Sequence, residues 1–266
     1  MIKLPKIKIK DLVLGVGKPK IAVPLVGTSL QSVIYAARQI GQQPAIDLVE
    51  WRIDFLSGLN NIAKLVDTAH QLQALIAPRP LLITLRTQVE GGHFNEGDQA
   101  YANIYQELLE NRCMDLIDLE ITAHSSVVIQ QLVKLAHRQN AKVIMSSHDF
   151  KQTPPPARLT SCLHQMERAG GDIAKIAVMP KNTTDILRLL EVTNDYHLKG
   201  KLPLISMSMG QLGKITRISG ELFGSCITFA SLSQASAPGQ IRLESMKMMI
   251  DELSIKDNLT LCFEYA

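Results

Sequence analysis

The sequence lacks the features that mark several classes of protein. Its four cysteines are scattered, with no CxxC pair and no Cys/His group at metal-ligand spacing, so we expect reduced structural thiols in a cytoplasmic protein. No apolar run approaches the ~20 residues that cross a membrane, and lysines interrupt the apolar residues of the N-terminus, unlike a signal peptide. The basic residues are dispersed and the formal net charge is only +3, so no nucleic-acid partner is expected.

Short β-branched apolar runs alternate with longer amphipathic segments along the 266 residues. Eight runs have the composition of strands, beginning at Ile21, Ala45, Pro80, Met114, Ala141, Asp172, Leu202 and Cys226. Eight strands that alternate with helices are typical of an α/β fold of the (β/α)8 TIM barrel type. The alternative is an open doubly wound sheet, but the turn after the first strand, VGTSLQS, has one glycine and no GxGxxG phosphate motif.

We expect a single domain with three parts: residues 1–20, 21–253 and 254–266. The lysine-rich first part alternates apolar and charged residues, which predicts a β-hairpin across the bottom of the barrel. The second part is the barrel, and the third is a tail without an assigned role. Helix starts are predicted at Ser29, Asp98 and Ser125.

Polar side chains collect toward one end of the predicted strands. Because alternate side chains of a barrel strand point inward, the sequence places on the inner faces Glu50, Arg52, Arg86, Asp118, Glu120, His148 and Lys175. Taken singly, Lys175 is explained as an ion-pair partner and His148 as a hydrogen-bonded core histidine. Their convergence at the C-terminal ends of the strands, where barrel active sites lie, indicates a catalytic site.

A lysine in this setting has a specific chemical use. Burial and neighbouring cations such as Arg86 and Arg217 favour a neutral amine on Lys175. A neutral amine can attack a ketone to form an imine, which acidifies the adjacent carbon. His148, on the neighbouring strand, can remove that proton near neutral pH. The pairing supports either carbon–carbon cleavage or elimination, and spacing does not choose between them.

Six segments carry a resemblance to a known family. DLVEWRID, TLRTQVEGG, SSHDF, DIAKIAVMP, SMSMG and ASAPGQI, in this order, resemble type I 3-dehydroquinate dehydratase of the shikimate pathway, from about Ile21 to about Ile250. The resemblance implies a hydro-lyase that converts 3-dehydroquinate to 3-dehydroshikimate and water. It implies a Schiff base on Lys175, general acid/base catalysis by His148 and a carboxylate clamp at Arg217.

The resemblance also implies roles for the surrounding residues. The ring hydroxyls would be held by Glu50, Arg52 and Arg86, and a closing loop would contribute Ser236 and Gln240. Supporting positions would be Glu90, Asp118, Glu120, Met207, Met209 and Phe229. Among these, Asp118 and Glu120 are assigned to support Lys175 or Arg52, and the last three form an apolar wall or plain barrel core. No metal or organic cofactor is implied, because the lysine supplies the electron sink, and a homodimer is expected.

Two other functions stay open at this point. A class I aldolase or transaldolase would also use a lysine of the sixth strand, but SMSMG and ASAPGQI do not resemble the phosphate site that such enzymes place after the last two strands. A catalytically inactive barrel with a binding role is the third reading. The joint presence of Lys175, His148 and Arg217 argues against it.

Overall fold

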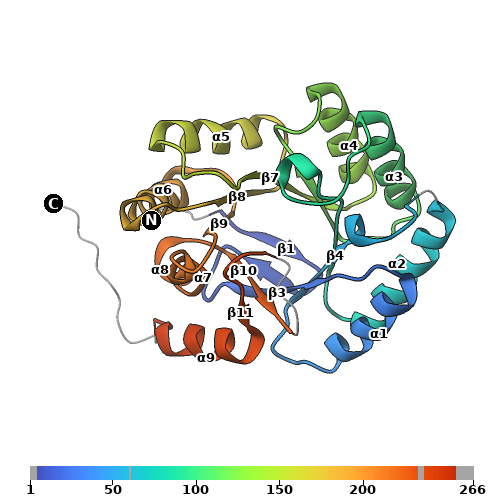
Figure 1. Ribbon diagram of the computed structural model, residues 1–266, viewed down its shortest axis with the longest axis horizontal. Helices are drawn as coiled ribbons and strands as arrows, with labels where there is room; N and C mark the ends of the chain where they lie inside the picture. The colour runs from blue at the N-terminus through green and yellow to red at the C-terminus, as the bar shows by residue number, and fades with distance from the viewer. Residues whose placement is uncertain (1–4, 60, 233–236, 256–266) are drawn as a thin grey trace.

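A ring of parallel strands forms the centre of the fold (Figure 1). The structure, a computed structural model, describes residues 5–59, 61–232 and 237–255. The ring consists of β3 (Lys20–Leu25), β4 (Leu48–Arg52), β5 (Leu81–Thr84), β6 (Leu116–Glu120), β7 (Lys142–Asp149), β8 (Ile173–Val178), β9 (Leu204–Ser208) and β10 (Ile227–Ser231). Each pairs with the next, β10 pairs with β3, and a bridge between Leu204 and Ser225 joins β9 to the start of β10. The expected (β/α)8 barrel is confirmed.

Helices cover the outside of this ring (Figure 1). The long ones are α1 (Leu30–Gly41), α2 (Ile62–Ile76), α3 (Asp98–Glu110), α4 (Ser126–Arg138), α5 (Pro156–Arg168), α6 (Thr183–Lys199) and α9 (Leu243–Leu253). Their apolar faces pack on the outward side chains of the strands, among them the fully buried Trp51. Among the described residues, no helix has the length and apolar character that a membrane crossing needs.

Shorter elements connect these helices and strands. They are the single turns η1 (Ile53–Phe55) and η2 (Gln88–Glu90), the helices α7 (Lys214–Ile218) and α8 (Gly220–Phe223), and β11 (Ile241–Arg242), which pairs with β10. The sequence pattern did not predict α7, α8 or α9. With five and four residues, α7 and α8 are too short to display a helical repeat of apolar side chains.

All three predicted helix starts are found. Ser29 caps α1 by accepting the backbone N–H of Ser32 at 3.2 Å, and Ser125 caps α4 by accepting from Val128. Helix α3 begins at Asp98 as predicted, and the residue that precedes it at the capping position is Gly97. The Asp98 carboxylate accepts the backbone N–H of Ser125 at 3.0 Å, so it ties α3 to the start of α4.

The predicted N-terminal hairpin is present and fills the lower end of the barrel. β1 (Ile7–Ile9) pairs antiparallel with β2 (Leu12–Leu14). Ile9 and Leu14 belong to the inner apolar cluster, together with the first inward residues of the strands, such as Leu48 and Leu82. The apolar interior is therefore sealed at the N-terminal ends of the strands. The polar inward residues lie above it, toward the C-terminal ends.

Leu14 provides a test of how strongly the hairpin stabilises the barrel. Because its side chain is fully buried, Leu14→Ala should lower the free energy of unfolding by about 2–5 kcal/mol through lost contacts and a residual cavity. Urea denaturation followed by far-ultraviolet circular dichroism measures the loss. Val16→Ala, at a side chain that is 45% exposed, is the control. A loss as small as that of the control would mean that the hairpin only rests on the barrel.

Candidate active site

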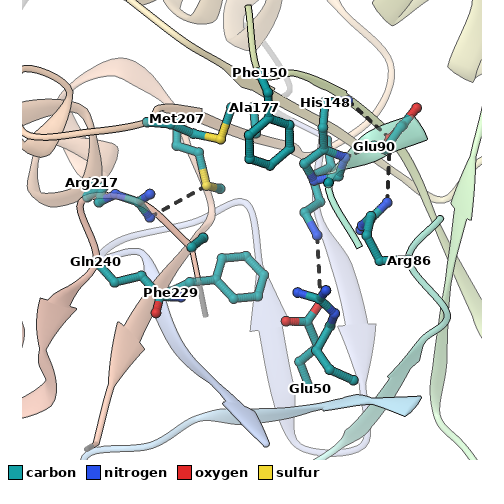
Figure 2. A pocket seen from close by; sticks show the side chains of 15 residues that line it. Glu50, Arg86, Glu90, His148, Phe150, Ala177, Met207, Arg217, Phe229 and Gln240 are labelled. Atoms are coloured by element: carbon teal, nitrogen blue, oxygen red, sulfur yellow. Dashed lines mark hydrogen bonds and ion pairs between the residues drawn. The ribbon is translucent and has the colours of Figure 1, made fainter. Parts of the chain in front are cut away.

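A cleft of about 540 Å³ opens at the C-terminal ends of the strands (Figure 2). Eleven of the residues predicted from the sequence line it: Glu50, Arg52, Arg86, Glu90, His148, Lys175, Met207, Met209, Arg217, Phe229 and Gln240. Asp118 and Glu120 are buried and contact the residues that line it. Ser236, also predicted, lies outside the described residues. The structure thus gathers side chains from most strands of the ring and from α7.

Lys175, on β8, lies between two carboxylates. Its Nζ is 2.9 Å from Asp118 Oδ2 and 3.8 Å from Glu50 Oε1. Thr84 holds Glu50 in place by donating to Oε1 at 2.8 Å. The Nζ atom is also 4.9 Å from the centre of the Phe229 ring, whose face attracts a cation. Asp118, which the sequence assigned to support Lys175 or Arg52, thus contacts Lys175, and Glu50 is an additional anionic neighbour of this amine.

Arg86, at the end of β5, organises the carboxylates around Lys175. Its guanidinium is 2.9 Å from both Asp118 Oδ1 and Glu120 Oε1. Burial alone would raise the pKa of Asp118, but the charges of Arg86 and Lys175 outweigh burial and hold that pKa well below its usual range. Glu120 pairs with Arg86 and accepts from the backbone N–H of Thr87, rather than supporting Lys175 or Arg52. The inner charges therefore form one connected network.

His148, on β7, is paired with Glu90 from the turn η2. Its Nδ1 is 2.7 Å from Glu90 Oε2, and Thr122 donates to Glu90 Oε1 at 3.0 Å. Burial, reinforced by the charges of Arg86 and Lys175, lowers the pKa of His148 well below 6.5. Burial also raises the pKa of Glu90 to about 8. The imidazole is neutral at physiological pH, and Nε2 is the ring nitrogen left to act on a molecule in the cleft.

Arg217, from the short helix α7, is a buried cation without a carboxylate partner among the described residues. Its guanidinium donates to the Pro238 carbonyl at 3.0 Å and contacts Met207 Sδ at 3.7 Å, and no partner is described for its buried Nε. Burial lowers the pKa of Arg217 to about 10, so it stays charged at neutral pH. Figure 2 shows it across the cleft from His148 and Glu90. Such a cation favours an anionic ligand.

Sequence reasoning missed several residues of the site. Thr84 and Ser146 share the inner faces with Arg86 and His148, so the alternation of their strands could have singled them out. Ser146 accepts from Arg86 and donates to Asp118. Phe150 lines the cleft and covers Gly91, whose φ of +82° and close approach to the ring leave no room for a side chain. The glycine pair in VEGG was the signal for this contact.

No group of three His, Cys, Asp or Glu side chains in the described part of the chain is arranged to hold a metal ion. The chemistry that the cleft offers comes from side chains. It combines a buried amine, a neutral imidazole with a proton-sharing carboxyl partner, and a cation for which the described residues supply no counter-ion.

Comparisons with known proteins agree on one family. Residues 21–257 match the profile described as Type I 3-dehydroquinase. The chain is 40% identical to the 3-dehydroquinate dehydratase of Lactiplantibacillus plantarum over 94% of its length and 99% of the relative. It resembles the crystal structure of type I 3-dehydroquinate dehydratase from Clostridium difficile with covalently modified comenic acid, with a TM-score of 0.89, 37% identity and coverage of 94% and 98%. The 3-dehydroquinate dehydratase of Geobacillus kaustophilus gives a TM-score of 0.89 at 33% identity, with coverage of 93% and 96%.

The raised pKa of Glu90 predicts how the free energy of unfolding changes with pH. Between the ordinary carboxyl pKa of 4.5 and about 8, the folded protein holds a proton that the unfolded chain has released, so Glu90 makes folding less favourable as pH rises through this window. Glu90→Gln removes that dependence. The free energy of unfolding of the variant minus that of the parent should therefore be about 2–4 kcal/mol larger at pH 8.5 than at pH 5.

Urea unfolding of both proteins at the two pH values measures this difference. Glu96→Gln, at an exposed position of the following loop, controls for the loss of a carboxylate as such. A difference between Glu90→Gln and the parent that does not change with pH would mean that Glu90 is ionised throughout.

Proposed function

The chain belongs to the type I 3-dehydroquinase family, and we propose on that premise that it dehydrates 3-dehydroquinate to 3-dehydroshikimate through an imine on Lys175. The observation that carries the proposal is the arrangement of the cleft. A buried lysine and a neutral histidine line the same cavity as an arginine that has no carboxylate partner among the described residues. A keto acid is the kind of substrate that such a cavity suits.

The reaction begins at the amine of Lys175. The nitrogen attacks the C3 ketone, and the resulting carbinolamine loses water to form a protonated imine. His148 Nε2 then removes a proton from C2, and the electron pair moves into the enamine. As the enamine expels the C1 hydroxyl, His148 returns the proton to it and water leaves. Hydrolysis of the conjugated imine releases 3-dehydroshikimate and restores the amine, so one water is lost overall.

The charges around Lys175 determine which groups carry protons at the start of the cycle. The form of Lys175 that pairs with Asp118 at 2.9 Å is the ammonium, which has no lone pair for attack. A base must take one proton first, and His148 suits this step because it is neutral and lines the same cleft. It then gives this proton to the carbinolamine hydroxyl, which leaves as water, so His148 is neutral again before it acts on C2. Asp118 stays ionised, so it stabilises the protonated imine that replaces the ammonium.

The cations and polar groups that line the cleft orient the substrate. The substrate carboxylate pairs with Arg217, whose planar fork of donors suits two oxygens. The ring hydroxyls are held by Glu50, Arg52 and Arg86, which line the same cleft. Gln240, which follows β10, lines the same cleft and offers a polar side chain to the substrate. The substrate contact of Ser236 rests on the family resemblance, because this residue lies outside the described part of the chain. Met207, Met209 and Phe229 limit access of water to the imine; all three are at least nine-tenths buried.

The same proposal extends to the state of the protein in the cell. The chain acts as one catalytic domain, in a homodimer, in the cytoplasm. The family profile spans nearly the whole barrel, which supports the single domain. The three cysteines that the structure describes are free thiols, which suits a reducing compartment. The family match leaves the aldolase and inactive-barrel readings without support.

Trapping with sodium borohydride tests the imine. With 3-dehydroquinate present, reduction should join the substrate irreversibly to Lys175, as shown by the intact mass and by peptide mapping. The variant Lys175→Met should give no adduct, whereas Lys181→Met, at an exposed lysine, should give the full yield. Turnover is followed separately by the ultraviolet absorbance of the enone product. A protein that binds substrate normally but stays unmodified would refute the mechanism.

The role of His148 is tested by its removal. His148→Ala should still form the imine, because the amine and the substrate contacts remain, but kcat should fall by roughly 10²–10⁴-fold through loss of the acid/base group. Steady-state kinetics and borohydride trapping are measured on the same variant. His164→Ala, at a side chain that is 46% exposed, is the control. If kcat of His148→Ala equals that of the parent, another group moves the proton.

A further inference from the structure

Arg52 and Asp54 form a buried ion pair where β4 ends and η1 begins. Arg52 Nε donates to Asp54 Oδ1 at 2.8 Å, and Nη2 donates to Oδ2 at 2.9 Å. Two parallel contacts of this kind fix the plane of a guanidinium as well as its position. Arg52 lines the catalytic cleft, whereas Asp54 lines a separate hollow beside His93. The carboxylate of Asp54 therefore holds the guanidinium of Arg52 on the side away from the catalytic cleft.

Asp54 is a strong anchor because it is enclosed and ionised. Its side chain has no exposed surface. Burial alone would raise the pKa of Asp54, but the hydrogen bonds and charge of Arg52 outweigh burial and lower it. A buried carboxylate that keeps its charge needs a close cation, and Arg52 provides it. Loss of the charge on Asp54 would leave the guanidinium without its counter-ion.

Further contacts hold the pair in one geometry. The backbone N–H of His93 donates to Asp54 Oδ2 at 3.2 Å, and the ring nitrogen Nδ1 of His93 lies 3.4 Å from the same oxygen. On the other side, the guanidinium carbon of Arg52 is 4.9 Å from the centre of the Phe55 ring. The contacts with His93 hold the carboxylate in place independently of Arg52. It acts as a fixed point rather than as a mobile counter-ion.

We propose that Asp54 is a positioning residue for substrate binding, which orients Arg52 so that its Nη1, without a protein partner among the described residues, is available to a hydroxyl of the bound substrate. This rests on the function proposed above, in which Arg52 holds a ring hydroxyl. A guanidinium fixed in advance loses less rotamer freedom when the substrate binds. Since Arg52 takes no part in bond making, loss of its anchor should weaken binding more than it slows the chemical steps.

The variant Asp54→Asn tests this role. Asparagine preserves the size of the side chain, removes the charge and turns an amide NH₂ toward a guanidinium N–H. We expect KM for 3-dehydroquinate to rise about 10-fold while kcat stays within about twofold. Borohydride trapping at saturating substrate should be unchanged. Asp67→Asn, at an exposed position of α2, is the matched control and should behave as the parent.

A double variant separates an effect through Arg52 from a purely structural one. If Asp54 acts through Arg52, then Arg52→Met and Arg52→Met/Asp54→Asn should have the same KM, because the second change has nothing left to misalign. The comparison also serves if Asp54→Asn alone does not fold, since removing both charges leaves no unpaired buried ion. An unchanged KM in Asp54→Asn, a further rise in the double variant, or a fall in kcat at constant KM would each overturn the proposal.

Failure of this inference is distinct from failure of the proposed function. Turnover of 3-dehydroquinate by the unmodified protein is measured first, from the enone absorbance. If it is absent, the proposed function fails whatever the variants do. If it is present and Asp54→Asn matches the parent, only the role of Asp54 is refuted.

Discussion

The site depends on the Asp118 carboxylate, which is held between Arg86 and Lys175 inside the barrel. Its Oδ1 lies 2.9 Å from the Arg86 guanidinium, and its Oδ2 lies 2.9 Å from Lys175 Nζ. Burying these charges is costly, and each is tolerated only because the others are present. The orientation of Lys175 and the ordering of Arg86 against Glu120 both follow from this arrangement. A change at Asp118 would therefore disturb the amine and the substrate contacts together.

The barrel separates its apolar and charged interiors along one axis. At the lower end, Ile9 and Leu14 of the hairpin complete an apolar cluster with the first inward residues of the strands. Above it, the next inward positions carry Glu50, Asp118 and Lys175. The apolar lower half stabilises the fold, and this offsets the cost of burying charges in the upper half. Buried charges also need rigid surroundings to stay paired. Glu50, Asp118 and Lys175 thus lie on strands, whereas Glu90 and Arg217 reach the site from η2 and α7.

Much of this could be predicted from the sequence, and the limits have physical causes. Strand alternation places Glu50, His148 and Lys175 on inner faces, since that depends only on the two-residue period. Which carboxylate meets which cation depends on the register between strands, so the pairing of Glu120 with Arg86 could not be read from a single chain. Asp54 lies beyond the end of β4, where the period stops. The carboxylate-clamp role of Arg217 was assigned by family resemblance alone, because α7 is too short to show which of its side chains are buried.

The pairing that closes the ring has a consequence for how the chain folds. Ile21 of β3 pairs with Thr228 of β10, and the hairpin that precedes β3 packs beneath strands from the whole length of the chain. Contacts between residues so distant in sequence are costly in loop-closure entropy and form slowly. During synthesis, β3 emerges from the ribosome before the other strands of the ring and must wait, with one edge unpaired, until β10 has been made.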